Sequence, residues 1–515
     1  MLKLLEFRGF LRNHREMARL LGLPEDLPRR EREEAIVREG CRRFGEKLPE
    51  MLQGTFAFAL EESESGEIFC ARDPFGAKAF YYTVTADGRF LGSHSIRKLL
   101  EDPQVQCILN EDMLGLYLTY TYVPGTETFF KGIHKLAPGH TLRFAGGQVT
   151  LRRYFAPRFA PDESKTLEEW GEEIHRVIAE TFPECEEDGE RIESFLSGGV
   201  DSSYVFALSH AKRSASIGYR DARFDEQPLA AATARLLGRE NLRLEIEPEE
   251  YFAAVPYVME NMEQPLADAS AIVFALGCRA AAQRTDICFS GEGADEFFGG
   301  YHSYSRAGHF RDPLEKFYIG NTNILKEDEK ALLLKNYIGR VRPIDVARPL
   351  HEEILDLDER ARMQLIDIQL YLDGDIQLNV DKMSEAAGLE VRMPLLDRRI
   401  FDVASRIPGR FMVSEEQTKI AFRKAAAHVL PAEIAERRKL GFPVPIRTWM
   451  ADPRYNGDVE KRLHSEAAGK FFHLPALHAL WQRYLEGDDV QWRKLWTVYT
   501  FLVWYGIYFE DLKVN

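Results

Sequence analysis

The chain has 515 residues, of which 45% are hydrophobic and 29% charged, and this predicts a globular protein of two or three domains. Its 67 basic and 82 acidic residues give a net charge of −15, which argues against binding to a nucleic-acid backbone, because such binding needs clustered Lys and Arg. The six cysteines are scattered without a CxxC pair, a pattern that argues against a zinc site or a disulfide scaffold.

The first part of the chain is rich in predicted strands. The stretches GTFAFALEES, EIFCARDPFG and AFYYTVTADGRFLGSHS alternate or run apolar between turn residues. The stretch APRFAPDESK, residues 156–165, contains two prolines and is typical of a linker. We therefore predict a strand-rich first domain over residues 1–155 and a second domain over residues 166–515.

Strands alternate with helices in the first half of the second domain. A helix is predicted over residues 166–182, because Leu167, Trp170, Ile174 and Val177 recur at helical spacing. Strands are then predicted at RIESFL, SASIGY, NLRLEIE and TDICFS, with helical stretches between them. This alternation predicts βαβ units and a parallel sheet. Beyond residue 313 the pattern is mostly helical.

The most apolar late stretch, LWTVYTFLVWYGIYF at residues 495–509, is too short to span a membrane and predicts a buried helix. The start, MLKLLEFRGF, is too short and too charged for a secretory signal. We therefore expect a cytoplasmic protein that binds neither a membrane nor nucleic acid.

Polar and flexible residues follow the first predicted strand of this sheet, in the stretch SGGVDSS at residues 197–203. Ligands of parallel sheets bind at the carboxyl ends of the strands. Here two glycines allow close approach of an anion, three serines offer hydroxyl groups, and the next helix begins. Asp201 would repel a phosphate unless a cation lay between them. The motif lacks the GxxxxGK[ST] pattern of a Walker A loop.

A second glycine-rich turn, CFSGEGADEFFGGY at residues 288–301, follows another apolar strand. It brings Glu292, Asp295 and Glu296 within five residues of one another. An acidic surface turn is the simpler interpretation of this motif alone. Because two such turns follow buried strands, we predict that Asp201 and Asp295 together hold Mg²⁺ against a triphosphate.

Two further charged stretches lie in the helical part. In DKMSEAAGLEVRMPLLD, residues 381–397, the spacing of Glu390 and Arg392 by itself indicates a structural ion pair. In RRKLGFPVPIRTWM, Lys439 lies in a loop bounded by Gly and Pro, and alone it would be a solvated charge.

With EQPLADASAI at residues 263–272, these five motifs in this order resemble the asparagine synthetase family, whose synthetase domain is an N-type ATP pyrophosphatase. The resemblance spans roughly residues 167–449. It implies an α/β synthetase domain with a parallel sheet, of the adenine-nucleotide α-hydrolase-like (HUP) type, and a helical carboxyl-terminal part. An α+β domain of the Ntn-hydrolase type would precede it.

The resemblance also implies a reaction in which a carboxylate, aspartate by default, attacks ATP, forms an acyl-adenylate with release of pyrophosphate, and is then attacked by ammonia or an amine. The cofactors would be ATP and Mg²⁺. By matched motif, Asp201 and Asp295 would bind the metal, and Glu292, Lys439 and Glu390 would be catalytic. The residues that would bind ATP and pyrophosphate are Leu196, Ser197, Gly198, Gly199, Asp201, Ser202, Ile217, Ser290 and Gly291.

Glu292 separates branches of this family. The β-lactam-forming relatives carry tyrosine there, paired with the glutamate that matches Glu390. Glutamate at this position favours amidation between two molecules, as in asparagine synthetases. A natural-product synthetase that forms a lactam or peptide bond, and a non-catalytic homologue, remain alternatives. Charged residues kept in tight glycine turns favour an enzyme.

The first domain departs from the family's glutaminase pattern. LQGTFAFAL and ARDPFGAKAFYY match it, but the motif Asn-Gly-Glu is replaced within FRGFLRNHREM, and the glutamine-binding segment is replaced by REREEAIV. Leu2 stands where the family has its nucleophilic Cys. We therefore expect a truncated, degenerate glutaminase domain. The nucleophile would be ammonia, either free or delivered by a separate glutaminase, or an amine of a second substrate. A homodimer is a further expectation.

Overall fold

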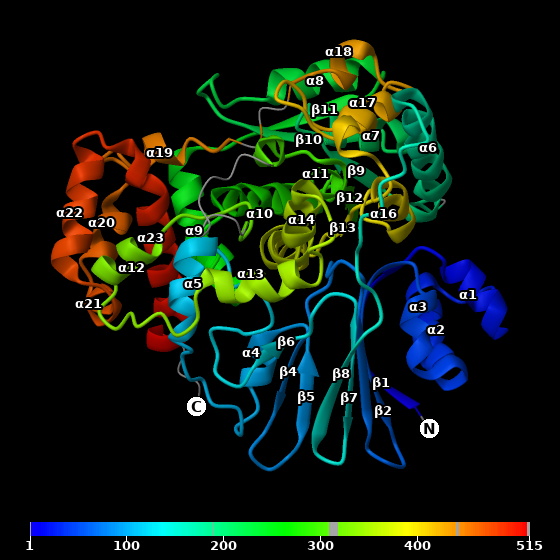
Figure 1. The fold of residues 1–515 in the computed structure, drawn as a ribbon, viewed down its shortest axis with the longest axis horizontal. Helices are drawn as coiled ribbons and strands as arrows, with labels where there is room; N and C mark the ends of the chain where they lie inside the picture. Colours follow the sequence, from blue (N-terminus) through cyan, green and yellow to red (C-terminus); the bar gives the residue numbers. More distant parts are fainter. Residues whose placement is uncertain (1, 188, 308–317, 439–440, 442, 512–515) are drawn as a thin grey trace.

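The protein is described here by a computed structural model that covers residues 2–187, 189–307, 318–438, 441 and 443–511. Two antiparallel sheets form an amino-terminal region, and the larger remainder is built around a parallel sheet with packed helices (Figure 1). The last helices, α20 (Gly457–Leu463), α22 (Leu474–Leu485) and α23 (Trp492–Tyr505), lie at the opposite side of the molecule from α6 (Leu167–Thr181) (Figure 1).

The amino-terminal region holds a five-stranded sheet of order β1-β2-β3-β7-β8 and a three-stranded sheet of order β5-β4-β6. Their strands are β1 (Leu2–Leu11), β2 (Gly54–Glu62), β3 (Ile68–Arg72), β4 (Tyr81–Val84), β5 (Phe90–Ser93), β6 (His134–Lys135), β7 (His140–Ala145) and β8 (Gln148–Arg153). The helices are α1 (His14–Leu21), α2 (Arg29–Phe44), α3 (Leu48–Met51), α4 (Ile96–Leu100) and α5 (Asp112–Tyr120).

The predicted alternation of strands and helices in the second part is confirmed. After α6 the elements are β9 (Ile192–Phe195), α7 (Val200–Leu208), β10 (Arg213–Gly218), α8 (Gln227–Leu236), β11 (Glu240–Glu245), α9 (Pro248–Met262), α10 (Ala269–Ala282) and β12 (Ile287–Phe289). The helical prediction beyond residue 313 missed β13 (Glu390–Arg392), which pairs with β12 in parallel. A strand of three residues is too short for its periodicity to be recognised.

The remaining chain is otherwise helical. Its α-helices are α11 (Ala294–Phe298), α12 (Glu327–Leu333), α13 (Pro343–Glu352), α14 (Glu359–Ile366), α15 (Gln377–Ala387), α16 (Arg398–Ala404), α17 (Ile420–Ala426), α18 (Ala432–Ala435), α19 (Ile446–Trp449), α20 (Gly457–Leu463), α21 (Glu466–Phe471), α22 (Leu474–Leu485) and α23 (Trp492–Tyr505). A π-helical segment, Asp367–Ile376, joins α14 to α15.

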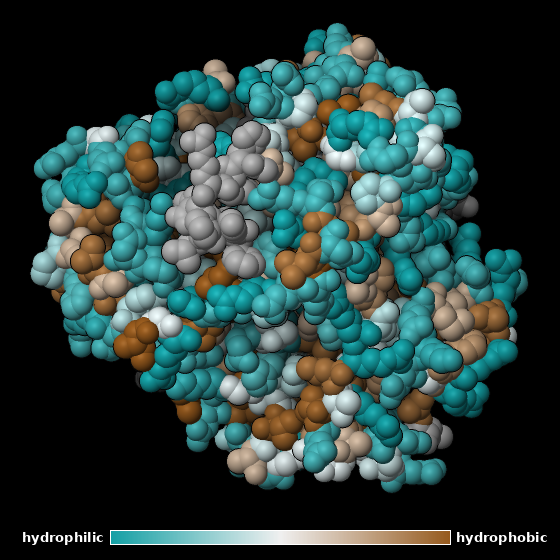
Figure 2. All heavy atoms as spheres, in the orientation of Figure 1, coloured by the Kyte–Doolittle hydropathy of each residue, from teal (hydrophilic) through white to brown (hydrophobic). Residues whose placement is uncertain are grey.

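Helix α23 occupies most of the apolar stretch 495–509, and its residues from Leu495 to Trp504 are buried, as predicted. Among the described residues, no helix combines the length and the apolar character needed to cross a membrane. The face shown in Figure 2 is largely hydrophilic, with apolar residues in small separate groups.

The two parts of the molecule share a hydrophobic core. Helix α5 and the segment that joins it to β6, residues 121–133, pack into the same hydrophobic cluster as α9, α10 and α23. The rings of Phe129 and Trp504 lie 4.9 Å apart, and the Tyr117 hydroxyl lies 2.7 Å from the Thr500 hydroxyl. The amino-terminal region therefore supplies part of the core of the second part, instead of resting on its surface.

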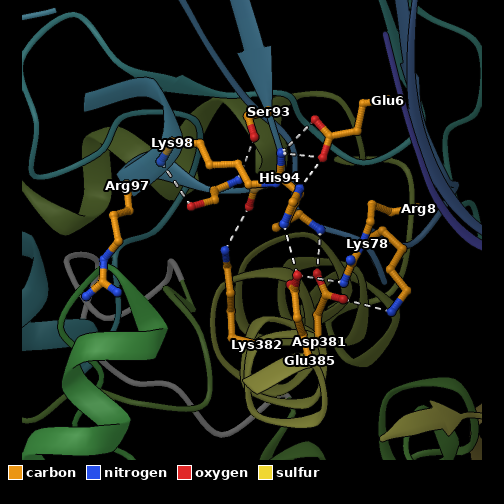
Figure 3. Close-up of polar contacts among 12 residues, drawn as sticks. Glu6, Arg8, Lys78, Ser93, His94, Arg97, Lys98, Asp381, Lys382 and Glu385 are labelled. Atoms are coloured by element: carbon orange, nitrogen blue, oxygen red, sulfur yellow. Dashed lines mark hydrogen bonds and ion pairs between the residues drawn. The ribbon is translucent and has the colours of Figure 1, made fainter. Parts of the chain in front are cut away.

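Buried charges also join the two parts (Figure 3). The His94 ring at the end of β5 lies between Glu6 of β1 and Glu385 of α15, with 2.9 Å between its Nε2 and the Glu385 carboxylate. These two carboxylates raise the pKa of His94 although burial opposes the shift. Lys78 is paired with Asp381 at 2.7 Å. The interface is thus specified by polar contacts as well as by packing.

Asp367 provides a prediction for pH dependence. It is fully buried, and it accepts hydrogen bonds from the hydroxyls of Tyr304 and Tyr318 and from the Asn321 N–H at 2.7, 2.8 and 2.9 Å. Burial raises its pKa from 3.8 to about 7. The folded state therefore keeps a proton that the unfolded state releases above about pH 4. The contribution of Asp367 to the free energy of unfolding is thus lost as pH rises from about 4 to about 7.

We expect Asp367→Asn to gain stability relative to the wild type as pH rises from 5 to 8, by at most about 3 kcal/mol. Thermal unfolding of both proteins at unit steps of pH measures the difference. A difference that stays constant from pH 5 to pH 8 would show that Asp367 remains ionised in the folded state.

Candidate active site

The five parallel strands have the order β11-β10-β9-β12-β13. Successive strands are therefore added on one side of β9 up to β11, and on its other side from β12 onward. Strands β9 and β12 are neighbours although about 90 residues separate them, with Phe289 opposite Ser194. The connections that leave them diverge, and a crevice forms at their carboxyl ends. Both glycine–acid turns begin at this crevice.

Hydrogen bonds within the first turn, residues 197–203, involve the hydroxyl groups of its own serines. The Ser197 and Ser202 hydroxyls lie 3.0 Å apart, and the Gly199 N–H donates to the Ser197 hydroxyl at 3.2 Å. Gly198 has φ 85°, and a Cβ there would lie 2.8 Å from the Leu229 side chain. Helix α7 begins at Val200 without a side-chain cap, so its first N–H groups point to the crevice.

The second turn packs directly on the first. A Cβ at Gly291 would lie 2.9 Å from the Ser202 nitrogen and 3.0 Å from the Asp201 carbonyl carbon. A side chain at Gly291 would therefore push the two turns apart. This contact explains physically why the second motif needs a glycine at that position.

Lys419 links the two predicted metal ligands. Its Nζ lies 2.5 Å from the Asp201 carboxylate and 2.9 Å from the Asp295 carboxylate, and its side chain is 1% exposed. The residue has φ 57° at the start of α17, an uncommon conformation for a side chain of this size. Gly300 allows this arrangement, since a Cβ there would collide with Asp295 and Lys419.

A cavity of about 260 Å³ opens beside these turns. Apolar side chains, including Ile217 and Phe274, form one wall, and polar groups form the other. Nine of the predicted site residues line this cavity, namely Leu196, Ser197, Asp201, Ser202, Ile217, Ser290, Gly291, Glu292 and Asp295.

Gly198 and Gly199 line an adjoining hollow of about 40 Å³, which shares Ser197 and Asp201 with the cavity. Four basic residues line it, Lys419, Arg423, Arg437 and Arg438, and they outnumber the two acidic ones, Asp201 and Glu226. We refer to it as the cationic hollow.

The basic residues of this hollow are held in place by backbone carbonyls. Arg437 donates to the Gly198 carbonyl at 2.6 Å. Arg423 donates to the carbonyls of Thr418, Ala435 and Arg437, each at 2.8 Å. The sequence analysis missed these residues and Lys419, because they follow no spacing that marks a phosphate site. The only signal in the sequence that could have indicated them is the many basic residues after position 418.

Acidic groups dominate the other end of the cavity. Glu292 accepts a hydrogen bond from the Ser290 hydroxyl at 3.4 Å. Glu296 lies buried behind it, hydrogen-bonded by the Tyr301 hydroxyl, and burial together with Asp295 raises its pKa to about 8.

Three further polar residues at this end were not predicted. Asp268 lines the cavity and accepts the Ser270 N–H at 2.9 Å at the start of α10. Burial, and then the charges of Asp268 and Glu292, raise the pKa of Asp375. Asn379 lines the cavity and is 7% exposed, and in the described structure neither its Oδ1 nor Asp375 Oδ1 has a hydrogen-bond partner.

The structure does not bring Glu390 to this site. Glu390 lies opposite Ile287 at the amino end of β13, whereas the crevice lies at the carboxyl ends. Its carboxylate is 2.7 Å from Arg392, which also contacts Glu190 at 2.7 Å. Glu390 therefore does not line the cavity, and the ion pair indicated by its spacing is present. Lys439 lies outside the described residues.

The predicted metal ligands fit a divalent cation in part. Asp201 Oδ1 is buried without a hydrogen-bond partner in the described structure, and carboxylate oxygens suit Mg²⁺. Among the described residues no group of three His, Cys, Asp or Glu side chains converges on one metal position. Two carboxylates suffice where phosphate oxygens complete the coordination.

Comparison with known proteins identifies both parts of the chain. Residues 173–506 match the asparagine synthase family model, and residues 3–155 match the glutamine amidotransferase domain model. Asparagine synthetase [glutamine-hydrolyzing] 1 of Bacillus subtilis is 31% identical over 91% of this chain and 80% of its own length. A putative asparagine synthetase [glutamine-hydrolyzing] of Mycobacterium bovis is 30% identical over 93% and 80%. Amidase chyE of Penicillium rubens is 25% identical over 51% and 42%.

These matches confirm the resemblance found in the five motifs. The parallel sheet, the preceding antiparallel sheets and the two glycine–acid turns agree with the order of the two matched models. The chain belongs to the asparagine synthase family of carbon–nitrogen ligases, which carry out ATP-dependent amidation.

Proposed function

We propose that this chain is an AMP-forming amide ligase of the asparagine synthetase type, with an ATP site of the adenine-nucleotide α-hydrolase kind. It adenylates a carboxylate, releases pyrophosphate and transfers the acyl group to ammonia or an amine. The observation that carries this proposal is the contact of the two glycine–acid turns at the crevice between β9 and β12.

In this proposal the cavity and the cationic hollow bind different parts of ATP. The adenosine packs against the apolar wall formed by Leu196, Ile217 and Phe274. The β- and γ-phosphates enter the cationic hollow, where the start of α7 and Lys419 offer N–H groups and positive charge. Negative charge builds up on pyrophosphate as it leaves, and fixed cations stabilise that charge most in the transition state.

Asp201 and Asp295 would hold Mg²⁺ between themselves and the phosphates. The metal supplies charge neutralisation where carboxylates and phosphates come together. Without it, Lys419 offsets the mutual repulsion of the two carboxylates. Lys439 keeps its proposed role near the phosphates on the strength of its motif.

The substrate acid binds at the acidic end of the cavity. Every charged side chain among the described residues that line the cavity is acidic, so an acid that also carries an ammonium group suits it, and aspartate is the default. The carboxylate oxygen bonds to the α-phosphorus of ATP and the bond to pyrophosphate breaks. The amine nitrogen then attacks the acyl carbon, AMP leaves with its oxygen, and Glu292 accepts the proton.

The alternative product is a lactam or another natural-product amide. The relative named amidase chyE is compatible with such a divergence, although it covers half of this chain. Glutamate at position 292 supports amidation between two molecules. The six cysteines are free, and this supports a cytoplasmic location. A homodimer, or a separate glutaminase as partner, is part of this proposal.

We expect this 515-residue polypeptide to release no glutamate from glutamine. Five of its cysteines are buried, and burial raises the pKa of Cys107, so no thiol is activated as a nucleophile. Arg8 and Glu33, in the altered motifs, are used structurally: Arg8 pairs with Glu385 at 2.9 Å, and Glu33 accepts the Leu11 N–H at 2.8 Å.

Glutamate release with and without ATP and acid measures this. Ammonia in place of glutamine is the positive control. Glutamate formed at the rate of AMP, and blocked by a thiol-alkylating glutamine analogue, would contradict the expectation.

The proposed reaction is tested by pyrophosphate release with ammonia against a panel of acids. The panel pairs aspartate with its α-amide, which keeps the ammonium group and the reacting carboxylate but lacks the second carboxylate. We expect AMP and pyrophosphate in equal amounts with one or more amine-bearing acids. ADP and phosphate as products would refute the proposal.

A further inference from the structure

Two walls of the acidic end of the cavity are attached to the amino-terminal region. One wall is the segment 263–268, which ends at Asp268. The other is the beginning of α15, which carries Asn379. A buried ion pair, Lys382 with Glu263 at 2.6 Å, joins the two walls.

Glu263 starts its segment in a strained conformation. It has φ 62° and ψ −15° directly after α9, a conformation that is uncommon and strained for a non-glycine residue. Such a conformation persists only where the surroundings fix it. Here the Trp504 indole donates to the Glu263 carbonyl at 3.0 Å, and the carboxylate is fixed from the other side.

The amino-terminal region supplies that second set of contacts. The Glu263 carboxylate accepts the Ser95 hydroxyl and the N–H groups of Ile96 and Arg97, the latter two at 3.0 and 3.2 Å. It therefore caps the start of α4. Lys382 also donates to the His94 carbonyl at 2.7 Å. Figure 3 shows the Lys382 side chain reaching from α15 toward His94 of the amino-terminal region.

The rest of the segment is attached to the same region. The Phe129 N–H donates to the Gln264 side chain at 3.1 Å, and the Ala267 N–H donates to the Thr121 carbonyl at 2.8 Å. Asp381, beside Lys382, accepts the Ala79 N–H at 2.9 Å. The residues that face the substrate thus depend on contacts from residues 79–129.

We propose that Lys382 and Glu263 are positioning residues, which hold segment 263–268 and the start of α15 in the geometry that binds the substrate acid. The amino-terminal region then has a role in amide formation that needs no glutamine hydrolysis. This inference rests on the proposed function, because it assigns the acid to the end of the cavity that contains Asp268 and Asn379.

The test compares Lys382→Met and Glu263→Gln with Arg12→Met. Arg12 also joins the two parts through a buried pair, 3.1 Å from Asp397, but neither of these two residues lines the cavity. For the Lys382 and Glu263 variants we expect the KM for the acid to rise about tenfold or more, with the KM for ATP within about twofold. Arg12→Met should lower the unfolding temperature without this selective change in KM. Lys382→Arg should restore part of the loss.

Hydrogen exchange provides a readout that does not depend on turnover. The amides of Gln264, Leu266 and Ala267 should exchange faster in Lys382→Met and Glu263→Gln than in Arg12→Met. Equal exchange in all three variants, or an equal rise in the KM for the acid with Arg12→Met, would overturn the positioning role. If the wild type releases no pyrophosphate with any acid, the proposed function fails, and the exchange data still decide whether the ion pair holds the segment.

Discussion

Replacing Asp201 or Asp295 by asparagine is expected to lower the rate of AMP and pyrophosphate formation by about 100-fold or more. Each substitution keeps the shape of the side chain and removes one of the two charges that face the phosphates. Asparagine still accepts a hydrogen bond from Lys419, so the contacts at 2.5 and 2.9 Å need not break. The loss should therefore appear in activity more than in stability.

Glu390→Gln is the matched control. Glu390 carries the same type of charge on the same sheet, but it lies at the amino end of β13 and pairs with Arg392. We expect its activity to stay within about threefold of the wild type, since Glu390 does not line the cavity and Arg392 keeps its pair with Glu190. Pyrophosphate release over a Mg²⁺ titration measures all three variants. Full activity of Asp201→Asn, or equal losses in Glu390→Gln and Asp295→Asn, would contradict the assignment of the site.

The fold of the second part could be predicted because its information is local. Apolar runs at RIESFL and TDICFS and helical spacing in residues 166–182 correspond to β9, β12 and α6. The position of the crevice also followed, since glycine-rich turns after parallel strands indicate the carboxyl edge. Strand β13 did not follow, because its three residues join the sheet only through pairing with β12.

The cations of the site could not be predicted from spacing. Lys419 reaches Asp201 across 218 positions in the sequence, and only the folded chain places α17 beside α7. For Glu390 the direction of the strand decides: its motif was expected at the site, but the direction of β13 places it at the far end of the sheet from the crevice. Asp375, buried in the π-helical segment before α15, had no motif of its own.

Lys419→Met should lower the free energy of unfolding by about 3 kcal/mol in the absence of divalent cations. Removing one partner of a buried ion pair leaves an uncompensated charge and costs about 3–5 kcal/mol. The lower end applies here, because the Asp201 and Asp295 side chains are 18% and 17% exposed. Methionine fills a similar volume, so loss of charge is the main change.

The repulsion left in Lys419→Met should be relieved by Mg²⁺. We therefore expect Mg²⁺ to raise the unfolding temperature of Lys419→Met more than that of the wild type, whose lysine already neutralises the pair. Lys424→Met, at an exposed position of the same helix, is the control and should stay within about 0.5 kcal/mol of the wild type. Thermal unfolding with EDTA and with Mg²⁺ gives both quantities. If Lys419→Met is as stable as Lys424→Met in EDTA, or if Mg²⁺ stabilises it no more than the wild type, the two carboxylates do not depend on Lys419 and do not form a shared cation site.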